Sequence, residues 1–169
     1  SKMILKTLEN VDKPALAGLW PNENNMNIVL DLGANVECSE KNLIDFSEMG
    51  SALFKSLFPN EKAKLSLLNI GSEEIKGTGI LKSAYAKLKQ LDQLGDFEFR
   101  GYIEGNNITK GDTNIIVTDG FTGNIALKTA EGTAEFLTKN LKKALSENIF
   151  SKLSSIFSYF SLKRFKDRL

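Results

Sequence analysis

The segment TDGFTGN (residues 118–124) carries two glycines, two threonines, an aspartate and an asparagine directly after the apolar run NIIV. A helix that starts within residues 122–124 would point its unpaired N–H groups and the positive end of its dipole at any anion beyond it. The segment matches neither the P-loop nor the G-x-G-x-x-G pattern, so it indicates a phosphate cradle without specifying a nucleotide. The candidate phosphate-binding residues are Gly120, Thr122, Gly123, Asn124 and Lys128.

A second interpretation of this segment needs no ligand. Asp119 or Asn124 caps the helix, and Lys128 pairs with Glu131 one turn further on. On the residues alone, both interpretations stay open.

Other polar side chains follow the apolar runs upstream. The segment NIGSEEIKG brings Asn69 and Lys76, and DLGAN brings Asp31 and Asn35. A lysine can hold phosphate or stabilise an oxyanion, and an amide can orient a reacting group. The acids of NIGSEEIKG have a simpler explanation, because Ser72 as an N-cap would place both of them in the first turn of a helix.

Four short runs are typical of strands, at residues 27–34, 64–71, 97–105 and 114–121, and helical patterns occupy residues 39–58 and 73–91. This alternation predicts an α/β fold with a mostly parallel sheet. The link between the last two strands is short for a parallel crossover, so that pair is open to an antiparallel arrangement. The glycine-rich polar segments all follow strands, so we expect them to converge at the carboxyl edge of the sheet, where such folds bind ligands.

The composition excludes several kinds of site. The chain of 169 residues has no histidine, which excludes most zinc sites and histidine-based triads, and we expect neither a metal nor a cofactor. Its single cysteine, Cys38, cannot form an internal disulfide and is expected to be a small buried filler. No run of 18 apolar residues predicts a membrane-spanning helix.

The charge is unevenly distributed along the chain. Residues 1–138 hold 14 Lys+Arg and 19 Asp+Glu, whereas residues 139–169 hold 8 and 2. This asymmetry favours a tail that meets an anionic partner, although a solvated helix surface is the plainer alternative.

Five blocks of the sequence resemble, in order, those of the bacterial PlsX phosphate acyltransferases. They are DKPALAGLWP, VLDLGANVEC, FSEMGSALF, LSLLNIGSEEIKGT and YIEGNNITKGDTNIIVTDGFTGNIALKTAEG. The resemblance implies a three-layer α/β/α fold like that of phosphotransacetylases and isocitrate/isopropylmalate dehydrogenases, with a long C-terminal dimerisation helix. It also implies the conversion of long-chain acyl-ACP and inorganic phosphate to acyl phosphate, which feeds phosphatidic acid and phospholipid synthesis.

The resemblance further implies roles and partners. Asp119 would orient the phosphate, and Asn35, Asn69 and Lys76 would orient groups or stabilise the oxyanion. The protein would be a cytoplasmic homodimer at the inner face of the membrane, with a glycerol-phosphate acyltransferase as a further candidate partner and no nucleic acid.

The chain departs from the family pattern in three places. A DAMGGD-like start and an SHG-like block are absent, and the common EGRD block reads Glu104-Gly105-Asn106-Asn107. We therefore expect residues 1–148 to be a partial acyltransferase domain, inactive if the missing parts are needed.

The C-terminal region has two patterns. A stripe with spacings of three and four, from Leu127 to Ala144, is typical of a helix that packs on a partner helix. The pattern of residues 149–169 suits an apolar, basic membrane tip, and the family resemblance implies that the start of a second dimerisation helix follows it. The tip residues are Phe150, Phe157 and Phe160. A core or dimer-interface helix is the alternative for this region. For the whole chain, the alternatives are a phosphotransacetylase-like or dehydrogenase-like enzyme and a non-catalytic membrane-binding dimerisation module.

Overall fold

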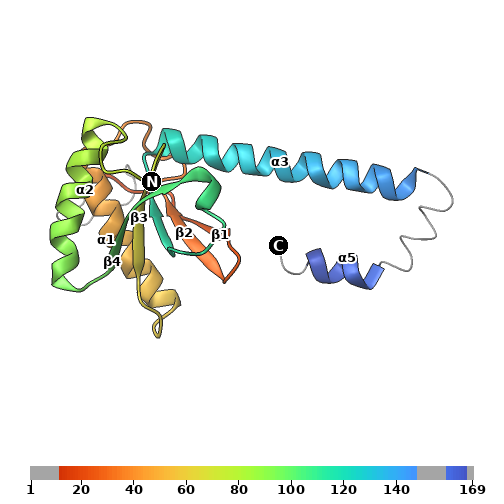
Figure 1. Ribbon diagram of the computed structural model, residues 1–169, viewed down its shortest axis with the longest axis horizontal. Coiled ribbons are helices and arrows are strands. Elements are labelled where there is room, and N and C mark those ends of the chain that lie inside the picture. The colour runs from red at the N-terminus through yellow and green to blue at the C-terminus, as the bar shows by residue number, and fades with distance from the viewer. Residues whose placement is uncertain (1–11, 148–158, 167–169) are drawn as a thin grey trace, which may run out of the picture. The chain divides into compact units, whose positions relative to one another are not determined.

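The computed structural model describes residues 12–147 and 159–166 (Figure 1). They fall into two compact units, one that ends at Ala126 and one that begins at Leu127. The first unit holds the sheet and two of the helices. Helix α3, which runs from Gly120 to Ser146, begins in the first unit and continues in the second.

The sheet has five strands in the order β1-β2-β5-β3-β4. Their bounds are β1 Gly18–Pro21, β2 Met26–Leu30, β3 Lys64–Asn69, β4 Glu98–Glu104 and β5 Ile115–Val117. The pairs β2–β5, β5–β3 and β3–β4 are parallel, and β1 is antiparallel to β2. All four predicted strands and the mostly parallel sheet are therefore confirmed, whereas the short edge strand β1 was not predicted.

The predicted option of an antiparallel pair formed by the last two strands is wrong. Strand β5 lies between β2 and β3, so β4 and β5 are not neighbours, and both run parallel to β3. Residues 105–114 connect them without an α-helix. About ten residues reach roughly 33 Å when extended, which is enough to return along the sheet past one strand. Hydrogen bonds from Glu23 N–H to the Thr109 carbonyl and from the Asn27 amide to the Ile108 carbonyl hold this link.

Helix α1 runs from Glu40 to Leu57, close to the predicted range 39–58. Ser39 is its N-cap. The Ser39 side chain accepts from the Asn42 N–H, and the Asn42 side chain accepts from the Ser39 N–H. This reciprocal capping box replaces the missing intrahelical partners and sets where the helix begins.

Helix α2 runs from Gly79 to Leu91, so it begins later than the predicted range 73–91. Its N-cap is Thr78, whose hydroxyl accepts from the Leu81 N–H at 3.3 Å. The expected Ser72 cap is wrong. Gly77 has a φ of +88°, which a helix cannot accommodate, and residues 70–77 form a loop instead.

Helices α1 and α2 lie side by side and share one buried core with the sheet (Figure 1). From the strands this core takes Ile28, Leu30, Leu65, Leu67, Ile115 and Val117. From the helices it takes Leu43, Phe46, Phe54, Ala84 and Leu88. The strand residues are alternate positions, so α1 and α2 cover the same face of the sheet. Each of the larger side chains contributes about 1.5–3 kcal/mol through burial.

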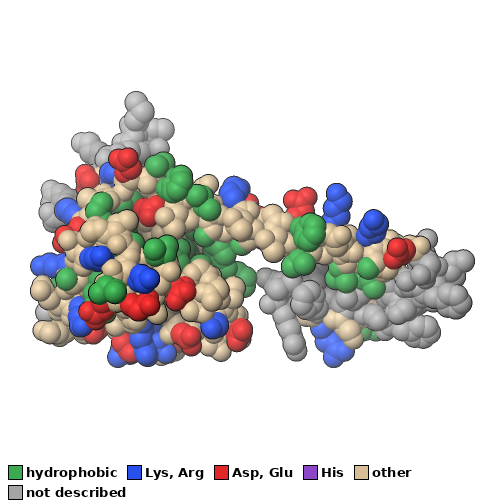
Figure 2. Space-filling model, turned by 45° about the horizontal axis from the view of Figure 1, so that its top comes forward, with side chains coloured by type: hydrophobic (Ala, Val, Ile, Leu, Met, Phe, Trp, Pro, Cys, Tyr) green, Lys and Arg blue, Asp and Glu red, His purple; other side chains and the backbone are tan. Residues whose placement is uncertain are grey.

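The second unit is helical where it is described. It contains the rest of α3 and helix α5, Tyr159–Lys166. Hydrophobic side chains are exposed among charged ones along α3 (Figure 2), including Phe136, Leu137 and Leu141. Of the predicted tip residues, Phe160 is 73% exposed, and Phe150 and Phe157 lie outside the described residues.

Candidate active site

Three of the four predicted loops line one cavity at the carboxyl edge of the sheet. The cavity has a volume of about 610 Å³, within the range of small-molecule sites. Polar groups come from the ends of β3 and β5 and from the start of α2, namely Asn69, Thr78, Asp119 and Thr122. Apolar side chains form the rest of the wall, and these are Leu68, Ile70, Leu81, Ile125 and Ala126. The predicted convergence is therefore confirmed for the loops after β3, β4 and β5.

The loop after β2 borders a second cavity. Val36, Glu37 and Cys38 line a volume of about 690 Å³, which shares Thr78, Leu81 and Asp119 with the first cavity. Asp119 thus lies at the junction of the two hollows.

Asn69 offers the first cavity an unused donor. Its side chain is buried, with 8% of the residue exposed, and its Oδ1 accepts from the Ile70 N–H at 2.9 Å. Its Nδ2 is buried and has no hydrogen-bond partner among the described residues. Gly77 packs directly against it, since a Cβ there would lie 2.6 Å from Oδ1. A buried amide N–H₂ without a partner is costly, so this group is suited to an oxygen of a bound ligand.

Asp119 caps helix α3. Its Oδ1 accepts from the Thr122 N–H and its Oδ2 from the Thr122 hydroxyl, both at 2.8 Å. The helix therefore begins at Gly120, two residues before the predicted start. This is the capping interaction that the ligand-free interpretation predicted, and it uses both carboxylate oxygens while Asp119 still lines both cavities.

The two glycines of this turn allow the chain to pass close to itself. The Gly120 N–H donates to the Asn35 carbonyl at 2.8 Å, and the Gly123 N–H donates to the Asp119 carbonyl at 2.9 Å. A Cβ on Gly120 would lie 2.5 Å from the Asn35 carbonyl oxygen, and one on Gly123 would overlap the Asp31 carbonyl oxygen. The N–H groups of Gly120, Thr122 and Gly123 thus donate to protein oxygens.

Asn124 and Asn35 also bind the protein. The Asn124 amide donates to the Leu32 carbonyl at 3.2 Å. The Asn35 amide donates at 2.7 Å both to the Asp31 carboxylate and to the Pro14 carbonyl. Neither residue lines the two cavities. In this geometry, both amides stabilise the backbone around the site.

Asp31 organises the loop after β2. It is fully buried, and its carboxylate accepts from the N–H groups of Leu16, Gly33, Ala34 and Asn35 at 2.8–3.1 Å. These charge-assisted hydrogen bonds compensate the cost of burying the acid.

The two candidate lysines lie outside this cavity lining. Lys76 is exposed on the β3–α2 loop, and it has no ion-pair partner among the described residues. Lys128 belongs to the second unit and pairs with Glu131 at 2.7 Å, as the ligand-free interpretation predicted.

Sequence reasoning missed Lys13. This half-buried residue lines the second cavity, and its ammonium donates to the Glu37 carbonyl at 3.0 Å. It lies in the family-like block DKPALAGLWP, but only its place in the fold shows that it borders a cavity. Cys38 lines the same cavity, and burial raises the pKa of its thiol, which fits a filler better than a nucleophile.

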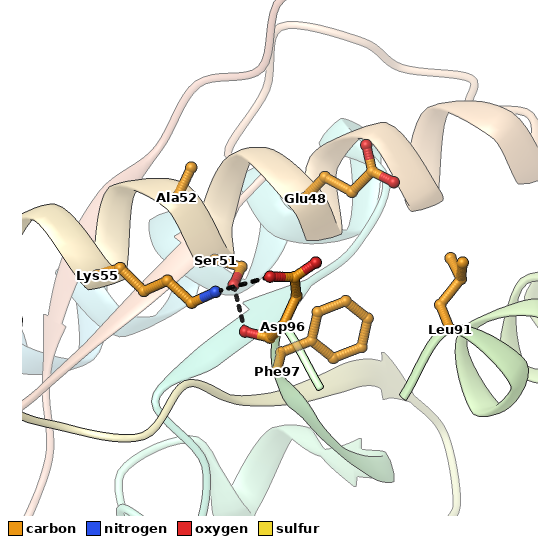
Figure 3. Close-up of a pocket in the computed structure, with 7 residues that line it drawn as sticks. All are labelled: Glu48, Ser51, Ala52, Lys55, Leu91, Asp96 and Phe97. Atoms are coloured by element: carbon orange, nitrogen blue, oxygen red, sulfur yellow. Dashed lines mark hydrogen bonds and ion pairs between the residues drawn. The ribbon is translucent and has the colours of Figure 1, made fainter. Parts of the chain in front are cut away.

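Another hollow, of about 450 Å³, lies at the opposite end of the sheet (Figure 3). Lys55 on α1 forms an ion pair with Asp96 at 3.2 Å, and the Ser51 hydroxyl donates to the Asp96 carbonyl at 3.3 Å. Phe97, just before β4, is buried below them. Because these groups pair with one another and lie before a strand, this hollow is not the candidate site.

Within residues 12–147 and 159–166, no group of three or more His, Cys, Asp or Glu could hold a metal ion. None of the helices described there is long and apolar enough to cross a membrane.

A family model described as fatty acid synthesis protein matches residues 1–169. The chain is 64% identical over its full length to a phosphate acyltransferase of Pelagibacter ubique, of which it covers 50%. It is 41% identical over its full length to the enzyme of that name from Bartonella bacilliformis, covering 47% of it. It is 45% identical to the phosphate acyltransferase of Delftia acidovorans, and that match covers 94% of this chain and 46% of the relative. The chain thus spans about half the length of these relatives.

Among solved structures, the fold is similar to that of the EutD phosphotransacetylase from Staphylococcus aureus. The TM-score is 0.63 at 14% sequence identity, over 79% of this chain and 46% of that one. The expected phosphotransacetylase-like α/β fold is thereby confirmed.

Proposed function

The chain belongs to the PlsX family of phosphate acyltransferases, and from that membership we propose that it forms acyl phosphate from acyl-ACP and inorganic phosphate. In this reaction a phosphate oxygen attacks the thioester carbonyl carbon, and a tetrahedral oxyanion forms. The C–S bond then breaks, the carrier leaves as its thiol with the proton of the phosphate, and acyl phosphate remains. The protein has to position two substrates and stabilise the oxyanion, and a protein nucleophile is not needed.

The observation that carries this proposal is the Nδ2 of Asn69, which has no hydrogen-bond partner among the described residues and lies in a cavity with an apolar wall. In the proposal this amide donates to the thioester oxygen, where negative charge develops. A buried donor that is already in place loses little in reorganisation, so it can stabilise the transition state more than the ground state. Leu68, Leu81 and Ile125 provide the apolar surface for the first carbons of the acyl chain.

Phosphate binds, in the proposal, beside Thr122 and Asp119 at the start of α3. The positive end of the helix dipole favours an anion there. Because Gly120, Thr122 and Gly123 direct their N–H groups at protein oxygens, they act by shaping the turn. Lys76 remains a candidate for the counter-charge because its side chain is long and exposed, whereas Lys128 is paired with Glu131 within the second unit.

Replacing Asn69 by alanine in the complete gene product tests the proposal. We expect kcat for acyl phosphate formation from acyl-ACP and phosphate to fall by about a hundredfold, as for other oxyanion donors. Asn60→Ala, on an exposed turn after α1, is the matched control and should leave kcat unchanged. An Asn69→Ala enzyme with normal kcat would contradict the role of this amide.

Membrane attachment and dimerisation are further parts of the proposal. Exposed Phe160 and Tyr159 on α5, together with Lys163 and Arg164, suit a peripheral contact with anionic lipid at the cytoplasmic face. The exposed hydrophobic side chains of α3 suit a second copy of the chain. A vesicle flotation assay tests the tip. We expect Phe157→Glu with Phe160→Glu to abolish binding to anionic vesicles, and retained binding would rule the tip out. In the same proposal the acyl phosphate passes to a glycerol-phosphate acyltransferase.

A further inference from the structure

One segment of the first unit is basic although the unit as a whole is acidic. Residues 12–126 hold 11 Lys+Arg and 16 Asp+Glu, yet residues 75–91 hold four lysines and no acid. This segment comprises helix α2 and the last part of the loop before it. Its inner face is buried through Ala84 and Leu88, so the lysines lie on the outer face.

Most of this positive charge is not neutralised. Lys89 pairs with Glu74 at 3.0 Å. Lys82 and Lys87 are exposed, and no ion pair within the described part of the chain includes either of them. Other than Glu74, the acids nearest to this segment in sequence are Asp92, whose carboxylate accepts from the Phe99 N–H at 3.0 Å, and exposed Glu73 in the preceding loop.

Lys82 also lies at an unfavourable position in its helix. It is the fourth residue of α2, and the first turn of that helix contains no acid. A positive charge near a helix N-terminus opposes the helix dipole and destabilises the helix. A negatively charged partner near Lys82 would offset this cost.

Large apolar side chains are also exposed in the same segment, residues 75–91. Ile75 is 78% exposed and Ile80 is 47% exposed. Apolar residues surrounded by charges of one sign are typical of a binding surface for a partner of the opposite sign. We name Ile75, Ile80, Lys82 and Lys87 the basic α2 face.

The basic α2 face adjoins the candidate active site. Gly77, Thr78 and Leu81 line the cavity that contains Asn69, and Ile80 lines the second cavity. A macromolecule bound to the outer face of α2 would therefore have a short path for a flexible thioester arm into the site.

We propose that the basic α2 face is the docking surface for the acidic carrier protein that delivers the acyl thioester. This inference rests on the proposed acyltransferase function. Opposite charges steer the two proteins together, and the exposed isoleucines provide the apolar contact that holds them. The active-site residues then act on the thioester arm and have no part in recognising the carrier.

Charge reversal at Lys82 and Lys87 in the complete gene product tests this proposal. We expect Lys82→Glu with Lys87→Glu to weaken binding of labelled acyl carrier protein about five- to tenfold at low salt, and less at high salt. KM for acyl-ACP should rise by a similar factor, while kcat and the KM for a short acyl-pantetheine thioester stay the same. The control is Lys110→Glu, which reverses the charge of an exposed lysine in the β4–β5 link, and it is compared with Lys82→Glu and Lys87→Glu made one at a time.

The outcomes separate the alternatives. Carrier binding equal to that of Lys110→Glu overturns the proposal, and so does an equal loss with acyl-pantetheine. Unchanged carrier binding with lost binding to anionic vesicles would make this face a membrane surface instead. A protein that binds the carrier through these lysines but produces no acyl phosphate from either thioester would contradict the proposed function alone. If the reversals prevent folding, Lys82→Gln with Lys87→Gln, expected to give a smaller loss of binding, decides between the same outcomes.

Discussion

Two loops at the carboxyl edge of the sheet look alike in sequence and differ in how their polar groups are used. In the β5–α3 turn, Asp119 caps the helix, and the N–H groups of Gly120 and Gly123 donate to carbonyl groups of the protein. At the end of β3, where the β3–α2 loop begins, the Nδ2 of Asn69 has no partner among the described residues, and Lys76 in the loop has no ion pair with any of them. The polar groups of the first loop form hydrogen bonds within the protein that stabilise the turn, whereas the second loop has polar groups that can still bind a ligand. A segment rich in glycine and polar residues is therefore not by itself an anion site.

Gly123 provides the strongest test of the structural role of the turn. A methyl group there would overlap the Asp31 carbonyl oxygen, which is backbone and cannot move aside. We expect Gly123→Ala to lower the free energy of unfolding by about 3 kcal/mol or more, measured by urea denaturation. The matched control is Gly132→Ala in the same helix, where a Cβ meets nothing within 4 Å. That change should raise stability by up to about 1 kcal/mol. A stable Gly123→Ala protein would break the contrast between the two loops.

Asp119 tests whether the turn has a catalytic role as well as a structural one. Asparagine caps helices about as well as aspartate, so Asp119→Asn should change stability by less than about 0.5 kcal/mol, whereas Asp119→Ala should cost about 1 kcal/mol. If the carboxylate also orients phosphate, the asparagine variant loses turnover at full stability. We expect a loss of at least about tenfold, measured with acyl-ACP and phosphate. Unchanged turnover would mean that Asp119 only caps the helix, and the β5–α3 turn would then have a purely structural role, unlike the β3–α2 loop.

The smallest expected effect concerns Glu74, whose hydrogen bonds attach the β3–α2 loop to helix α2. Glu74 accepts from the Tyr85 hydroxyl at 2.8 Å and from Lys89 at 3.0 Å, and these bonds lower the pKa of Glu74 below its ordinary value of 4.5. Burial, followed by this hydrogen bond, raises the pKa of Tyr85 to about 12. Because the folded-state pKa of Glu74 is depressed, this anchor stabilises the fold above pH 4.5 and is lost as the pH falls through the lower value.

Substituting Tyr85 by phenylalanine should therefore raise the pKa of Glu74 toward 4.5, as followed by NMR titration of the carboxyl carbon. Tyr102→Phe is the control, because the Tyr102 hydroxyl has no hydrogen-bond partner among the described residues. A pKa for Glu74 that is the same in both variants would show that the loop is not anchored through Tyr85.

Much of the fold follows from local patterns. The apolar runs predicted β2, β3, β4 and β5, and the helical pattern of residues 39–58 predicted α1. Strand β1 was missed because its four residues alternate between half-buried and exposed and end in a proline, which resembles a loop. The start of α2 was misplaced because Ser72 and Thr78 are both good caps. Only the positive φ of Gly77 distinguishes them.

The site could be predicted by region but not by atom. The sequence pointed to the edge of the sheet that holds the cavity, since loops after parallel strands meet there, and three of the named residues line this cavity: Asn69, Asp119 and Thr122. It did not reveal Lys13 or the apolar wall around Leu81 and Ile125, because those positions have no local chemical signature.

By itself, the sequence determined strands β2 to β5 and most of helices α1 to α3, the class of fold, the family and the absence of histidine, because these depend on composition, on short-range periodicity or on long matching blocks. The order of the strands, with β5 inserted between β2 and β3, was decided by the tertiary structure. The tertiary structure also decided which hydrogen-bond partner each polar group has. Whether an N–H faces a carbonyl of its own chain or an open cavity depends on segments many residues apart, as with Gly120 and Asn35, and hydrogen bonding is satisfied only when those segments have packed.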